Sequence, residues 1–180
     1  TTGLDYDASP YSSWNTASTH DDDQYRVRIQ HAGGPPPLAA NARSGILTVD
    51  NSPPENVGCA SPEDGAIGQS LFNSLIGLTA ADSPAGLNNT PYYFQIDTTP
   101  LFNSPQLRNS GWLSNNVWTI ALDSNTTYYW RIKARDDSDP RNETAFQAET
   151  GTPNSYRDFS TVNIYFAEEV EATEIDSTTN

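Results

Sequence analysis

The sequence predicts an all-β protein that folds as an antiparallel β-sandwich. Apolar residues with helical spacing are nearly absent, whereas apolar and polar residues alternate with a period of two in several short segments. Clusters of Gly, Pro, Asn and Asp, which favour turns, separate these segments. Many short alternating strands joined by turns are typical of two antiparallel sheets packed face to face.

The first predicted unit covers residues 1–52. YRVRIQ predicts a strand with Tyr25, Val27 and Ile29 on one face, and SGILTVD predicts another. The proline run in HAGGPPPLAANARS, between them, cannot continue a sheet. Two further prolines in NSPPEN remove backbone donors and favour an extended connection. We therefore predict a domain boundary at NSPPEN.

The second predicted unit covers residues 53–166. Its strands are expected in SLFNSLIGLTA, PYYFQIDT, NVWTIAL, TYYWRIKA and RDFSTVNIYF. Alternation within two of these segments predicts a main core made of Trp118, Ile120, Tyr128, Trp130 and Ile132. Residues 167–180 are rich in glutamate and predict either an acidic tail or a strand exchanged with another subunit.

The acidic composition limits the partners of the chain. Asp and Glu number 23 against nine Lys and Arg, a formal net charge of −14, which disfavours nucleic acid and anionic membranes. No apolar run approaches the roughly 20 residues that span a bilayer, so no membrane insertion is expected. Abundant small polar residues with scattered aromatics favour an extracellular location. Cys59 is the single cysteine, and we expect it to be a small buried or loop residue rather than a link to another chain.

One motif in the second unit resembles a known family. The motif reads Leu122-x-Ser124-x-Thr126-x-Tyr128 and is followed by Trp130, Ile132 and Ala134. It is similar to the L-x-P-x-T-x-Y corner and the following strand of fibronectin type III domains, with serine in place of the usual proline. PYYFQIDTTPLFNS and SGWLSNNVWTIA resemble the middle strands of bacterial members of that family. The resemblance implies one complete sandwich over residues 53–166.

The first unit resembles only part of a domain. SSWNTASTHDDDQYRVRIQ and SGILTVDNSPP are similar to the last strands of bacterial immunoglobulin-like surface repeats. A complete sandwich needs about 100 residues, so residues 1–52 imply its C-terminal part alone. Either the chain is a fragment of a longer protein, or another polypeptide completes the fold. In the second case NIYFAEEVEATEIDS would add a strand to the next subunit.

The loop DDSDPRNE is a candidate calcium site. It offers Asp136, Asp137 and Asp139, with Asn142 and Glu143 close behind. Calcium takes six to eight oxygen ligands, and clustered carboxylates on a loop supply them. The alternative is a solvated turn between the last two strands.

A second candidate calcium site lies at the domain boundary. Asp50, Asn51 and Glu55 would let a cation neutralise carboxylates from two consecutive units. The alternative is a polar linker. The acidic run HDDDQ, Asp21–Asp23, is expected at the opposite end of the first unit.

Catalysis is not predicted, because no nucleophile elbow, phosphate loop or zinc spacing occurs. Carbohydrate binding is the main alternative function. Tyr93 and Tyr129 fall on the outward phase of their strands, and Trp112 lies in a turn-rich segment, so all three could stack on sugar rings. Otherwise these aromatics stabilise the sheet face by about 0.2–1 kcal/mol per pair.

The sequence therefore predicts a non-catalytic structural or adhesive module of a microbial surface protein or appendage, acting as a spacer or filament subunit. Its expected partners are neighbouring domains or copies of the same protein. Calcium is the candidate cofactor, and no other is expected. The alternative is a carbohydrate-binding accessory module of a secreted protein, with polysaccharide as its partner. Three sequons, at Asn88, Asn125 and Asn142, are candidate glycan acceptors.

Overall fold

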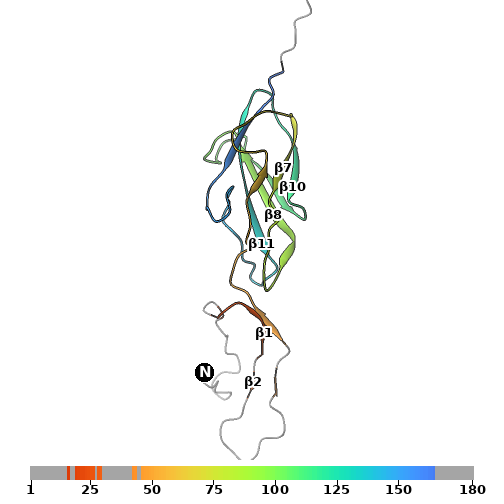
Figure 1. The fold of residues 1–180 in the computed structure, drawn as a ribbon, viewed down its shortest axis with the longest axis vertical. Helices are drawn as coiled ribbons and strands as arrows, with labels where there is room; N and C mark the ends of the chain where they lie inside the picture. The colour runs from red at the N-terminus through yellow and green to blue at the C-terminus, as the bar shows by residue number, and fades with distance from the viewer. Residues whose placement is uncertain (1–15, 17–18, 27, 30–41, 44–45, 165–180) are drawn as a thin grey trace, which may run out of the picture.

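The computed structural model describes residues 16, 19–26, 28–29, 42–43 and 46–164 (Figure 1). These residues form strands and no helix, which confirms the predicted all-β class. No membrane-spanning helix is found in this described part of the chain. The strands are β1 (Asp22–Tyr25), β2 (Arg28–Ile29), β3 (Ala42–Arg43), β4 (Leu47–Val49), β5 (Cys59–Ser61), β6 (Ala66–Gln69), β7 (Phe72–Gly77), β8 (Leu87–Asp97), β9 (Arg108–Leu113), β10 (Val117–Ala121), β11 (Thr127–Asp136) and β12 (Arg157–Thr161).

The strands from β5 onward form two sheets. One has the order β10-β7-β5 and the other the order β6-β12-β11-β8-β9. Every pair in them is antiparallel except β6 with β12, which is parallel, so the expectation of wholly antiparallel sheets is wrong at this pair. The chain leaves β5 in the first sheet and crosses to the second without reversing. Gly65, with a φ of 71°, supplies the left-handed conformation just before β6. Gly68, with a φ of 65°, lies within β6, where the register with β12 shifts.

Both sheets contribute to one hydrophobic core. Trp130, Phe94 and Phe159 of the five-stranded sheet and Leu75 of the three-stranded sheet are 0% exposed. The Trp130 and Phe94 rings stack with their centroids 6.4 Å apart. Burial alternates along β11 as the sequence predicts, although Trp118 of the predicted core is only partly buried at its margin.

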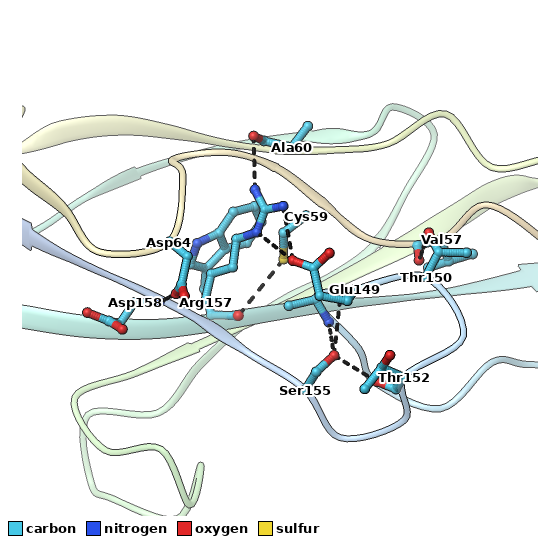
Figure 2. A network of polar contacts seen from close by, with 12 residues as sticks. Val57, Cys59, Ala60, Asp64, Glu149, Thr150, Thr152, Ser155, Arg157 and Asp158 are labelled. Carbon is cyan, nitrogen blue, oxygen red and sulfur yellow. Dashed lines mark hydrogen bonds and ion pairs between the residues drawn. The ribbon is translucent and has the colours of Figure 1, made fainter.

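Polar contacts tie β5 to β12 across the edges of the two sheets (Figure 2). Arg157 donates from Nη1 to the carbonyl of Ala60 at 3.2 Å and forms an ion pair with Glu149 at 3.1 Å. Cys59 is 1% exposed and its Sγ lies 3.9 Å from the carbonyl oxygen of Trp130. Burial raises the pKa of the Cys59 thiol, which keeps it protonated. The expectation of a small buried cysteine is confirmed.

The N-terminal described residues form two small antiparallel sheets, β1 with β4 and β2 with β3. Among the described residues, no strand pair joins them to the larger sheets. Residues 50–56, here called the connecting segment, lead from β4 to β5. The predicted boundary falls within this segment. The first fifteen residues and the predicted tail, 167–180, lie outside the described residues, so completion by another polypeptide and strand exchange stay predictions.

Candidate metal centre

Three aspartates from distant parts of the sequence meet where the connecting segment joins the larger sheets. Asp50 follows β4, Asp82 lies in the loop between β7 and β8, and Asp136 is the last residue of β11. One carboxylate oxygen from each lies within 4.8 Å of the other two. We call these residues the three-aspartate cluster.

Asp136 is the buried member of the cluster. Its exposed fraction is 0%, because the β11 alternation turns it inward at the end of the sheet. The loop that follows folds back around its carboxylate. Oδ1 accepts the Ser138 hydroxyl at 2.7 Å and the Asn142 N–H at 2.8 Å, and Oδ2 accepts the Asn142 side-chain amide at 2.7 Å. These bonds hold the carboxylate in place.

Asp50 fastens the connecting segment to the larger sheets. Its Oδ2 accepts the Ala85 N–H at 2.9 Å, and its Oδ1 accepts the Ser52 N–H at 3.0 Å. Its backbone carbonyl accepts the Asn142 amide at 3.2 Å. The carboxylate is therefore held by the connecting segment itself and by the loop between β7 and β8.

Asp82 is the member of the cluster whose charged form the surroundings destabilise. Its Oδ2 is buried and has no hydrogen-bond partner. Burial, followed by the negative charges of Asp50 and Asp136, raises the pKa of Asp82 to about 7. A proton or a cation is needed to compensate three carboxylates held this close together.

The donor set fits a hard cation. Oxygens that coordinate one calcium ion at about 2.3–2.6 Å are separated by no more than about twice that distance, as these three are. Carboxylates alone select calcium, magnesium or manganese rather than softer metals. The cluster supplies three carboxylates, and water would complete the larger coordination number of calcium.

One residue from each of the two predicted acidic sites lies in the three-aspartate cluster. Asp50 and Asp136 belong to the three-aspartate cluster, whereas the other four predicted ligands do not. Asp137 accepts the Asn88 amide, Asn51 donates its backbone N–H to Asp21, and Asp139 and Glu55 are exposed. Asp21 thus lies against the connecting segment, not at the opposite end of the first unit as expected.

Asp82 was missed by the sequence analysis. It lies in TAADSPAG, where an aspartate before Ser-Pro is an ordinary turn residue. No motif in the sequence links Asp82 to the other two aspartates. The structure brings them together because β8 and β11 pair antiparallel, with Leu87 opposite Asp136, so the loop before β8 and the loop after β11 lie at the same end.

The aromatic candidates separate into two groups. Tyr93 and Trp112 touch, with ring centroids 5.2 Å apart at 69°, and both are half-buried. Tyr129 instead packs against Tyr156, at 5.4 Å and 85°. The three residues therefore do not form one stacking platform.

The sequons lie in different environments. Asn125 is exposed in the turn before β11, with a φ of 50°. Asn88 is 8% exposed, and Asn142 uses its amide nitrogen within the three-aspartate cluster. Because a glycan attaches at that same nitrogen, Asn125 offers the most accessible acceptor of the three.

Comparison with known proteins finds no family model and no curated protein that matches this chain. The function is therefore inferred from the geometry of the chain itself.

Proposed function

We propose that this chain is a non-catalytic structural segment of an extracellular microbial surface protein or appendage, in which a fibronectin type III or immunoglobulin-like β-sandwich acts as a spacer. The connecting segment meets the sandwich at the three-aspartate cluster. We call this contact the joint, and calcium bound by the three aspartates stabilises it. Neighbouring domains or copies of the same protein are its partners.

A tyrosine at the start of β11 supports the sandwich assignment. The Tyr128 hydroxyl accepts the Asp123 N–H at 3.1 Å and donates to the Asp123 carboxylate at 3.3 Å. A tyrosine that bonds back to the backbone a few residues upstream is the hallmark corner of immunoglobulin-like sandwiches. Two sheets that share one core are in keeping with the same architecture.

The parallel pairing of β6 with β12 is the observation that supports a mechanical role. The chain enters the larger sheets from the connecting segment at one pole and leaves after β12 at the opposite pole (Figure 1). Tension along the chain therefore pulls β6 and β12 in opposite directions along their length. The bonds between them, which include Gly65 N–H to Asp158 at 2.8 Å and Val162 N–H to Gln69 at 2.9 Å, are loaded in shear. Bonds in shear must break together, so this arrangement resists extension.

Single-molecule extension of the chain, held at its two ends, tests this role. Val162→Pro removes the N–H that bonds to Gln69, and we expect it to lower the unfolding force. Ile164→Pro, two residues further along at an exposed position, is the matched control and should leave the force unchanged. Equal forces for the wild type and Val162→Pro would contradict the proposed role.

Carbohydrate binding is the second candidate function. The contact between Tyr93 and Trp112 on the outer face of the five-stranded sheet supports it, since half-exposed rings present apolar faces to sugars. In this case the chain is an accessory module of a secreted protein.

A further inference from the structure

The outer face of the five-stranded sheet concentrates positive charge on a strongly acidic chain. Arg131, Lys133 and Arg135 occupy successive outward positions of β11 and are three of the nine basic residues in the sequence. Residues two apart on a strand lie about 7 Å from each other, so the three cations extend over about 13 Å.

Aromatic rings lie between these cations. Lys133 Nζ is 4.9 Å from the Trp112 centroid, 5.4 Å from that of Tyr93 and 5.3 Å from that of Phe146. The Arg135 guanidinium is 4.1 Å from Trp112, and that of Arg131 lies between Phe102, at 3.8 Å, and Phe146, at 4.8 Å. The rings hold the cations in fixed positions. We call the three cations, with Tyr93, Trp112 and Phe146, the cationic strip.

The two arginines of the strip lack carboxylate partners. Lys133 forms an ion pair with Glu143 at 2.6 Å, but no carboxylate in the described chain lies within ion-pair distance of Arg131 or Arg135. Arg131 donates from Nε to the Gln95 side chain, and Arg135 donates to Thr90. These neutral acceptors orient the guanidinium groups without neutralising them, which leaves their charge for an external anion.

We propose that the cationic strip binds an anionic polysaccharide. Planar guanidinium groups pair with carboxylates or sulfates in two-bonded geometry, and the adjacent rings pack against sugar C–H groups. The net charge of −14 repels polyanions from the rest of the surface, so binding is confined to the strip and is sensitive to salt. This inference deepens the second candidate function and is independent of the three-aspartate cluster and the spacer role.

Titration of the whole chain with polygalacturonate tests the inference. Tryptophan fluorescence reports binding, and a chelator in the buffer removes any contribution of calcium. We expect binding at low salt that weakens as salt is added. Arg131→Gln/Arg135→Gln should weaken it by about tenfold or more, because two charge-assisted contacts are lost. Arg131→Lys/Arg135→Lys should give an intermediate affinity, since charge remains without the planar fork.

A matched control removes the same two charges elsewhere. Arg26→Gln/Arg141→Gln replaces two exposed arginines outside the strip and should bind like the wild type. Melting curves establish that each variant is folded. Equal binding by the two double Gln variants would overturn the inference, as would a wild type that binds no polyanion.

The same titration with other polymers shows which class of ligand the cationic strip binds. If the chain binds dextran sulfate as tightly as polygalacturonate, the inference holds for anionic polysaccharides in general. If it binds polygalacturonate alone, the inference holds for polysaccharides that contain uronates. Neutral dextran bound as tightly as either overturns it while supporting the second candidate function. Polyglutamate bound in place of the polysaccharides overturns it and assigns the strip to acidic peptides.

Discussion

The side-chain amide of Asn142 donates a hydrogen bond to the backbone carbonyl of Asp50, 3.2 Å away, although 92 residues separate them. The same amide donates to the Asp136 carboxylate at 2.7 Å. One side chain thus joins the connecting segment to the end of β11.

Replacement of this amide should destabilise the joint. Asn142→Ala leaves a buried carboxylate and a carbonyl with fewer donors, which costs about 1–3 kcal/mol. Urea unfolding measures the loss, and Asn115→Ala, in the exposed turn before β10, is the control. Equal unfolding midpoints for the two variants would show that the contact contributes nothing.

Removal of the Tyr128 hydroxyl should weaken the corner before β11. Tyr128→Phe leaves the buried ring in place and removes the bonds to Asp123, so we expect a loss of about 0.5–1.5 kcal/mol. Tyr129→Phe, at the neighbouring outward position, should change the free energy of unfolding by less. The reverse order in urea unfolding would count against the tyrosine corner.

Truncation of Trp130 should have the largest effect on the core. Trp130 is 0% exposed and stacks on Phe94, so Trp130→Ala should cost about 3–5 kcal/mol. Its indole N–H is buried without a hydrogen-bond partner, so Trp130→Phe removes an unsatisfied donor and should cost clearly less. Thermal melting of both variants measures the difference, and a Trp130→Ala melting temperature close to that of the wild type would refute the central position of this side chain.

The raised pKa of Asp82 predicts a pH dependence of stability without metal. Its pKa is about 7 in the folded chain, against about 3.9 for an ordinary aspartate. Because the folded chain binds this proton more tightly, the stabilising contribution is complete below about pH 4 and is lost as the pH rises through about 7. Urea unfolding in chelator, from about pH 4 to pH 8, should therefore reveal a decline that Asp82→Asn removes. Exposed Asp139→Asn should keep the wild-type profile, and overlapping profiles for all three proteins would exclude a raised pKa at Asp82.

More of the fold than of the candidate metal centre could be predicted from the sequence. Alternation along TYYWRIKA predicted which side chains of β11 are buried, because the period of a strand is a local property. The parallel pairing of β6 could not be predicted, since it depends on where the chain crosses between sheets. The predicted ligands Asp50 and Asp136 meet Asp82 only through contacts between loops that are distant in sequence. Period and turn patterns carry no information on such contacts.

The effect of calcium on the melting temperature tests the central claim, that the three-aspartate cluster is a cation-dependent joint. Calcium at ten times its dissociation constant should stabilise the wild type by about 1.4 kcal/mol relative to chelator. For a chain of this size we expect a rise of about 3–6 °C. Asp82→Asn should abolish the rise, whereas the exposed Asp139→Asn should retain it. A wild type that melts at the same temperature in calcium and in chelator, or an Asp82→Asn variant that responds as the wild type does, would contradict the claim.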